Sequence, residues 1–346
     1  MSFMNLKVFG KNPSGEALRL VEQSRNYQQD HFANIEPTVV LRKEASYFNL
    51  IKKQLNRPKD IKPGRLLPSV KTDLKNLDTK DPLIIWFGHS SYLLVFNNFK
   101  ILVDPVFSGH ASPFKGLVKS FEGSNIYSVA DLPEIDLLII THDHYDHMDY
   151  ETIMGVQPIV RKIITPLGVG SHLRYWGFED QIITEVDWWD EVYINDDIKL
   201  TATPARHFSG RKIARGKSLW ASFALEIYGH KIFIGGDSGY SEQFRIIGEK
   251  FNSFDLAILE CGQYGVDWPM IHMFPEQTVQ AAKDLRANIL MPVHWGKFIL
   301  SLHPWNEPIK RMVQECTNRD QKFIAPLIGE VVKIYEPYTQ QWWWNF

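Results

Sequence analysis

The residues with the most distinctive chemistry are the run Thr-His-Asp-His-Tyr-Asp-His at positions 141–147. Neutral imidazole is a strong ligand for a borderline metal such as Zn²⁺, and packing alone gives no reason for three histidines so close together. The run overlaps the end of an apolar segment, 137–141, that is predicted to be a strand. Alternate residues of an extended chain point the same way, so His142 and His144 can hold one metal ion while Asp146 and His147 reach a second.

Other residues that could bind metal also follow predicted strands, which is where open sheets place their sites. They are His89 after 83–87, His207 after 198–203, Asp237 after 231–234 and His294 after 289–293. A lone histidine in such a position is more often a satisfied structural residue. These residues occur as a set, in order and each after a strand, and the set favours a metal site.

Further candidates lie beside this set. Asp104, after the strand predicted at 100–103, could accept a hydrogen bond from a ligand imidazole, or it could be a turn residue before a proline. His89 is a second candidate for such a supporting position. His272 could bind substrate or protonate the leaving oxygen, or it could be packed among apolar neighbours. With Asp146 and Asp237, His272 makes up the candidate catalytic residues.

The stretch 206–217 contains five basic residues and no acidic residue. Arg211, Arg215 and Lys217 are candidates for binding an anionic, phosphate-bearing substrate. The alternative is a solvated loop, because most charged residues are simply exposed.

Composition sets limits on the protein as a whole. The chain has 346 residues, of which 44% are hydrophobic and 23% charged, and its formal net charge is −2. Such a balance argues against a nucleic-acid binder with a large basic face. Two cysteines exclude a disulfide scaffold, and no apolar stretch is long enough to span a bilayer. We therefore expect a cytoplasmic protein.

The elements that must position the site begin near residue 82. Short apolar runs bounded by turn residues predict strands at 83–87, 92–96, 100–103, 137–141, 162–165, 182–185, 198–203, 220–227, 231–234, 256–260 and 289–293. Helices are predicted at 241–251 and 275–286. Many strands with interspersed helices indicate a layered α/β or α+β sandwich. Residues 1–80, with helices predicted at 16–32 and 42–55, form an N-terminal helical arm, and 81–346 form the main domain.

Through these histidines and aspartates, the chain resembles the metallo-β-lactamase superfamily over roughly 81–335. The pattern H-x-H-x-D-H, followed by a later His, Asp and His, is the dinuclear site of that superfamily. The resemblance implies an α+β fold, a four-layer αββα sandwich. It also implies that His142, His144 and His207 hold one metal, that Asp146, His147 and His294 hold the other, and that Asp237 bridges them.

A narrower resemblance is to the branch that includes N-acyl-phosphatidylethanolamine-hydrolysing phospholipase D. It is seen in Trp-Phe-Gly-His-Ser-Ser at 86–91, Leu-Val-Asp-Pro-Val-Phe at 102–107, Asp-Trp-Trp at 187–189, Pro-Ala-Arg-His at 204–207, Gly-Asp-Ser-Gly-Tyr at 236–240 and Pro-Val-His-Trp-Gly at 292–296. His272 matches a further active-site histidine of that branch. Asp237 stands where many true β-lactamases have Cys, which puts β-lactam hydrolysis in doubt, and His144 in place of Glu argues against redox chemistry.

The expected function is therefore that of a dinuclear metal-dependent hydrolase that uses a metal-bridging hydroxide. The substrate is expected to be a phosphodiester such as a phospholipid. The alternatives are an ester or lactone hydrolase of a small anionic metabolite and a metal-binding interaction protein without turnover. The two divalent ions are expected to be Zn, with Fe or Mn as alternatives.

The C-terminal sequence Gln-Trp-Trp-Trp-Asn-Phe at 341–346 leaves two interpretations open. Tryptophans favour membrane interfaces, so the tail could give peripheral membrane contact. The other interpretation is that it packs on its own domain or on a partner subunit of a homo-oligomer, since exposed aromatic clusters are disfavoured.

Overall fold

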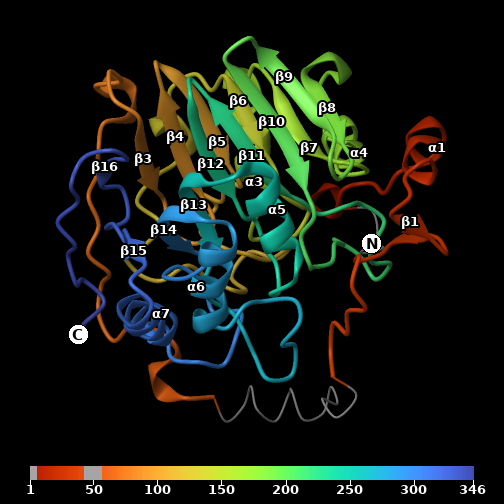
Figure 1. The fold of residues 1–346 in the computed structure, drawn as a ribbon. Coiled ribbons are helices and arrows are strands. Elements are labelled where there is room, and N and C mark those ends of the chain that lie inside the picture. Colours follow the sequence, from red (N-terminus) through yellow and green to blue (C-terminus); the bar gives the residue numbers. More distant parts are fainter. Residues whose placement is uncertain (1–5, 43–56) are drawn as a thin grey trace.

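Two seven-stranded sheets form the centre of the molecule (Figure 1). The computed structural model describes residues 6–42 and 57–346. In spatial order the first sheet consists of β16 (Val331–Lys333), β3 (Leu83–Trp86), β4 (Tyr92–Phe96), β5 (Phe99–Val103), β6 (Leu137–Ile139), β7 (Ile163–Pro166) and β8 (Ile183–Val186). The second consists of β15 (Lys322–Phe323), β14 (Ala287–Val293), β13 (Phe254–Glu260), β12 (His230–Ile234), β11 (Ser222–Ile227), β10 (Ile198–Thr203) and β9 (Glu191–Asn195).

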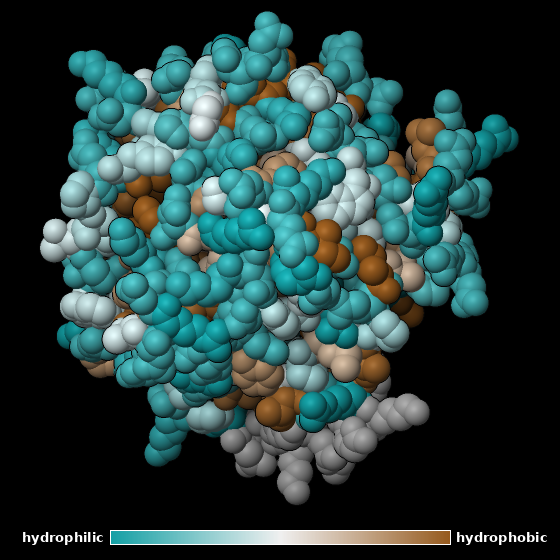
Figure 2. Space-filling view, viewed as in Figure 1, coloured by the Kyte–Doolittle hydropathy of each residue, from teal (hydrophilic) through white to brown (hydrophobic). Residues whose placement is uncertain are grey.

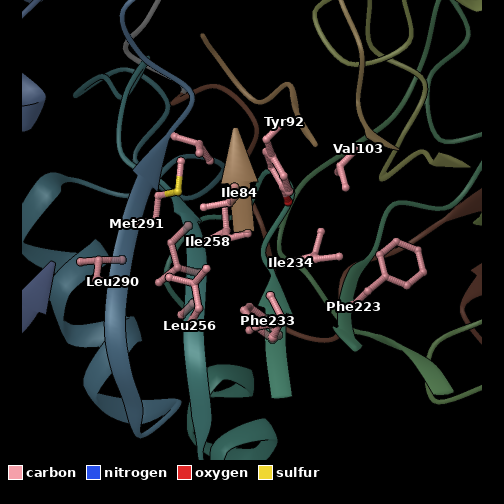
Figure 3. Close-up of a cluster of buried hydrophobic side chains, with 14 of the residues drawn as sticks. Ile84, Tyr92, Val103, Phe223, Phe233, Ile234, Leu256, Ile258, Leu290 and Met291 are labelled. Atoms are coloured by element: carbon pink, nitrogen blue, oxygen red, sulfur yellow. The ribbon is translucent and has the colours of Figure 1, made fainter. Parts of the chain in front are cut away.

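The sheets are packed face to face because their strands are apolar on both sides. In β3, Ile84 points into the layer between the sheets, whereas Leu83 points to the outer layer. Figure 3 shows the inner layer, where side chains such as Ile84 and Tyr92 of the first sheet lie with Ile258 and Met291 of the second. Burial on both faces requires a helical layer outside each sheet.

Helices provide those outer layers. The first sheet is covered by α3 (Tyr150–Val156) and α4 (Gly170–Tyr175), which contribute to the outer cluster. The second is covered by α5 (Gln243–Phe251), α6 (Pro275–Asp284) and α7 (Glu307–Asn318). The result is the four-layer α+β sandwich that the resemblance implied.

The predicted strands are all present, with ends that differ by no more than two residues, and the helices predicted at 241–251 and 275–286 are confirmed as α5 and α6. The strands β9, β15 and β16 and the helices α3, α4 and α7 were not predicted. These elements are short or mostly polar, so their apolar periodicity is weak.

The helix predicted at 16–32 is only partly correct. The helix α1 covers Glu16–Glu22, and a small hairpin of β1 (Tyr27–Gln28) and β2 (His31–Phe32) follows. Gln29 and Asp30 have φ angles of 50° and 67°, which close the hairpin and cannot continue a helix. The helix predicted at 42–55 lies, apart from its first residue, outside the described residues. The domain boundary at residue 80 stays a prediction.

The aromatic C-terminal tail packs on its own domain. Trp343 and Trp344 are buried, and the Trp343 ring stacks on Trp295 with 4.9 Å between centroids. Trp342 remains half exposed. Among the described residues no helix is both long and apolar enough to cross a membrane.

Candidate metal centre

The sequence-predicted metal ligands meet at one edge of the sandwich, where strands end. The run 141–147 follows β6, Asp237 follows β12 and His294 follows β14. His207 differs, because it lies in the long loop between β10 and β11. His89, Asp104 and His294 have φ angles of 54°, 40° and 65°. Such strained backbone in residues other than glycine persists only where the surrounding structure enforces it, and it clusters at functional sites.

A first group of side chains brings together His142, His144, His207 and Asp237. One potential ligand atom from each lies within 4.8 Å of the others. Nδ1 of His144 is 3.0 Å from Nε2 of His142 and 3.2 Å from Nε2 of His207. Three imidazoles and a carboxylate at such separations have the composition of a transition-metal site.

A second group consists of His89, Asp146, His147 and His294, again within 4.8 Å of one another. His89 Nε2 lies 2.9 Å from Asp146 Oδ2, and His147 Nε2 lies 3.7 Å from the same oxygen. His89 is therefore itself a candidate ligand. It also contacts Asp146, which is consistent with the supporting position suggested from the sequence.

Asp237, a member of the first group, also reaches the second. Its Oδ2 is 3.8 Å from Nε2 of His142 and 3.2 Å from Nε2 of His147. Its Oδ1 is 3.1 Å from Nδ1 of His294. A carboxylate that reaches both groups is placed as a bridging ligand would be.

Four of the histidines are held through Nδ1 by a neighbouring group. The partners are Thr141 Oγ1 for His142 at 3.0 Å, Asp104 Oδ2 for His147 at 2.7 Å, the Ile271 carbonyl for His207 at 2.9 Å and Ser90 Oγ for His294 at 3.0 Å. Contacts of this kind fix the orientation of metal-binding imidazoles and leave Nε2 free to coordinate. Asp104 therefore lies where its predicted supporting role requires.

The groups fit metal ions by an independent criterion. Nε2 of His294 is buried and has no hydrogen-bond partner within the described chain. Such atoms are costly unless something is bound to them. Burial also lowers the pKa of His142, His207 and His294, which keeps these imidazoles in the neutral form that binds metal. Burial alone would raise the pKa of Asp237, but the imidazoles around it, His147 foremost, hold it well below its usual range.

His272 reaches the same site and is paired with Glu260. Glu260 is not among the candidate residues identified from the sequence. Its Nδ1 lies 3.0 Å from Glu260 Oε2, and its ring stacks on that of His294 with 5.1 Å between centroids. Burial raises the pKa of Glu260 to about 7. Burial alone would lower the pKa of His272, but Glu260 reverses the effect and the pKa is raised. Glu260 is the last residue of a strand, β13, and that position was the signal that could have identified it.

Of the three basic candidates, only Arg215 faces the site. Arg211 is buried, and its guanidinium donates hydrogen bonds to the carbonyls of Asp143, Met148 and Val8. Lys217 Nζ pairs with Asp30 of the N-terminal arm. The geometry contradicts the substrate-binding role predicted for Arg211 and Lys217, because their donors are directed to other parts of the protein.

A cavity of about 330 Å³ opens beside the metal groups. Its apolar walls consist of Val40, Leu41, Phe208, Trp268, Ile271 and Leu300. Arg215, Asp146, Asp237 and His272 contribute polar groups. The site thus combines a few converging polar residues with an apolar surround, as small-molecule sites commonly do.

Several known proteins are similar to this chain. A family model described as a beta-lactamase superfamily domain matches residues 100–295. A protein of Mycobacterium tuberculosis (strain ATCC 25618 / H37Rv), described as uncharacterized, is 36% identical over 329 residues, which are 94% of this chain and 88% of that protein.

Two further proteins that are similar to this chain, one in sequence and one in structure, carry functional descriptions. The mitochondrial N-acyl-phosphatidylethanolamine-hydrolyzing phospholipase D of Saccharomyces cerevisiae is 33% identical over 257 residues, which are 71% of this chain and 54% of that protein. The match therefore spans about half the length of the yeast protein. The solved structure of Igni18, a metallo hydrolase from Ignicoccus hospitalis, has a TM-score of 0.57 at 21% identity and covers 73% of this chain and 98% of that chain. This likeness shows the fold.

Proposed function

Because the chain belongs to the metallo-β-lactamase superfamily, we propose that it is a metal-dependent hydrolase that cleaves the phosphodiester of a phospholipid. The observation that carries the proposal is the position of Asp237 between two groups of histidines and carboxylates. His142, His144 and His207 would hold one metal, and Asp146, His147 and His294 the other, with Zn preferred over Fe or Mn. Metals so held would activate a water and neutralise charge on the phosphoryl oxygens.

The chain's own residues supply the rest of the chemistry. Asp237 and Asp146 orient the site by linking its histidines. His272 donates a proton from Nε2 to the leaving oxygen, while Glu260 holds the proton on Nδ1. Arg215 at the cavity wall attracts the anionic phosphodiester.

The cavity favours a substrate with an apolar part. Its walls carry six apolar side chains beside the metal groups, and these can cover an acyl chain while the phosphate reaches the metals. The name of the yeast relative, a phospholipase D, supports the same substrate class.

An assay of metal-loaded protein tests the proposal directly. The panel contains bis-p-nitrophenyl phosphate, N-acyl-phosphatidylethanolamine and a set of lactones, with chelator-treated protein as the control. Turnover of the two phosphodiesters that is lost with chelator is expected. Turnover of lactones alone would favour an ester or lactone hydrolase. Turnover of none, with both metals bound, would favour a metal-binding protein without catalysis.

A phospholipid substrate implies contact with a lipid surface, and we propose that the rim of the cavity makes it. Figure 2 shows a largely hydrophilic face with small hydrophobic patches. Ile213 is fully exposed two residues before Arg215, and Val266 is exposed two residues before Trp268; Arg215 and Trp268 both line the cavity. Neither Lys212 nor Arg215, which flank Ile213, forms an ion pair with any residue in the described part of the chain, so both can attract anionic headgroups.

Vesicle binding distinguishes this rim from other exposed apolar residues. The double variant Ile213→Asp/Val266→Asp should lose co-sedimentation with vesicles of phosphatidylethanolamine and phosphatidylglycerol but keep activity on bis-p-nitrophenyl phosphate. Tyr193→Asp, at an exposed position on β9, is the matched control and should bind like wild type. Formation of a dimer that the double variant abolishes would show instead that a second copy covers the rim. The homo-oligomer expected from the sequence otherwise stays a prediction.

A further inference from the structure

A segment of the N-terminal arm, residues 31–42, crosses the loop that carries His207. We call this segment the strap. Its Phe32 N–H donates to the Gly216 carbonyl at 2.8 Å, and its Arg42 N–H donates to the Asp267 carbonyl at 2.9 Å. Between these points Val40 and Leu41 form part of the cavity wall beside the metal groups. The strap is therefore connected to two loops of the site rather than to the sheets alone.

Within the strap, Asn34 holds the backbone of His207 from both sides. Its Nδ2 donates to the His207 carbonyl at 2.8 Å, and its Oδ1 accepts from the His207 N–H at 3.0 Å. The indole of Trp220 donates to the same Oδ1 at 3.2 Å. One carboxamide thus satisfies both polar backbone groups of a single candidate ligand.

His207 depends on such support more than its neighbours do. His142 and His144 belong to one short run that directly follows β6, whereas His207 lies in the long loop between β10 and β11. A ligand on a loop needs outside contacts to stay within reach of its metal. The side chain of His207 has one such contact, from Nδ1 to the Ile271 carbonyl, and the backbone has Asn34.

The strap is itself fixed beside this contact. The guanidinium of Arg206 donates to Thr38 Oγ1 at 2.9 Å and to the Pro37 carbonyl at 2.8 Å. It also lies 3.6 Å from the carboxylate of Glu36. Because Arg206 precedes His207 in the chain, the strap bonds two consecutive residues of the ligand loop, Arg206 through its guanidinium and His207 through its backbone.

We propose that Asn34 is a positioning residue for His207 and that the strap thereby controls metal binding by the His142, His144 and His207 group. Loss of the two hydrogen bonds between Asn34 and the His207 backbone leaves the fold in place but lets His207 move out of reach of the metal ion. The expected effect is a metal affinity about 10–100-fold lower at that position, the usual consequence of removing an outer contact of a ligand. The proposal requires His207 to be a metal ligand but does not depend on which substrate is cleaved.

The variant Asn34→Asp tests it with almost no change of shape. Aspartate keeps an acceptor for the His207 N–H but places an oxygen against the His207 carbonyl, where the amide donated. We expect bound zinc, measured by mass spectrometry after dialysis against graded chelator, to fall from two ions per chain toward one. The electronic spectrum of the cobalt-substituted protein should lose the contribution of one position. Neither measurement involves turnover, so failure of the phosphodiesterase proposal would not affect them.

Asn26→Asp is the matched control. Asn26 lies in the same arm and donates to Asp187 at 2.9 Å, away from the metal groups, so this variant loses a comparable bond without touching a ligand. It should keep two ions. If Asn34→Asp does not fold, Asn34→Ser removes the carboxamide without adding charge and gives the same test. Folded Asn34 variants that bind both ions with wild-type affinity would overturn the proposal.

Discussion

His147 donates from Nδ1 to Oδ2 of Asp104 across 2.7 Å, and both side chains are fully buried. Asp104 also accepts from the Thr141 N–H and from Thr141 Oγ1, so its carboxylate receives three donors. The contact leaves Nε2 of His147 directed toward Asp237, 3.2 Å from its Oδ2. One carboxylate therefore fixes the ring orientation of a candidate ligand and the start of the run that contains it.

Asp104→Asn should weaken metal binding at the second group, which contains His147. The amide turns one acceptor into a donor, which must then face Thr141 or His147 without a bond. We expect an affinity loss of about 10–100-fold. Competition with a chromophoric chelator measures it. Asp136→Asn, which alters a carboxylate that bonds the Lys100 N–H, is the control and should bind metal like wild type. Equal affinities in both variants would contradict the role of Asp104.

Glu260→Gln should lower kcat through His272. His272→Ala removes the proton donor, with an expected loss of about 10²–10⁴-fold for an alkyl leaving group and a smaller loss for p-nitrophenolate, which leaves without a proton. Glu260→Gln should lower kcat by a smaller factor than His272→Ala. The double variant should have the same kcat as His272→Ala, because Glu260 acts only through the His272 imidazole. Additive losses would show that Glu260 acts independently. Glu276→Gln, whose carboxylate pairs with Arg311, serves as the control.

Substitution of Arg211 should affect the stability of the fold, whereas substitution of Arg215 should affect substrate binding. Arg211→Ala leaves buried carbonyls without donors and should lower the free energy of unfolding by about 3 kcal/mol. Arg215→Ala should leave stability unchanged and raise KM for an anionic phosphodiester, most strongly at low salt. Urea unfolding of both variants measures the free energy of unfolding, and kinetics at several salt concentrations measure KM. A rise in KM with unchanged stability for Arg211→Ala would restore the substrate role predicted from the sequence.

Lys297 should make stability depend on pH. Its ammonium is buried, where Nζ donates to the carbonyls of Phe87 and Val106, and burial lowers its pKa to about 7. The unfolded chain keeps this proton until a pH of about 10.4. Between those values the unfolded state binds more protons, so stability rises with pH by up to about 1.4 kcal/mol per unit from this group.

Lys297→Met removes that contribution because methionine carries no proton. Urea unfolding of metal-free wild type and variant from pH 7 to 9.5 should give a difference that grows with pH in favour of the wild type. A constant difference over this range would mean that Lys297 is protonated in the folded protein throughout.

The sequence alone determined eleven strands of the two sheets and the predicted ligands that meet at one edge. Strands with apolar residues on both faces are visible as short apolar runs, and chemically unusual residues directly after them are visible by type. For this reason His142, His207, Asp237 and His294 could be selected before any contact was known.

Only the tertiary structure revealed how these residues are supported. Asn34 bonds His207 across 173 positions of sequence, and Arg211 reaches Val8 across 203, so no local pattern could show either contact. Glu260 looked like the polar end of a strand until His272 was placed against it. The charge of Arg211 suggested a substrate, whereas burial directs its donors to the backbone. Residue type indicates what a side chain can do, but the packing of distant segments decides which partner it has.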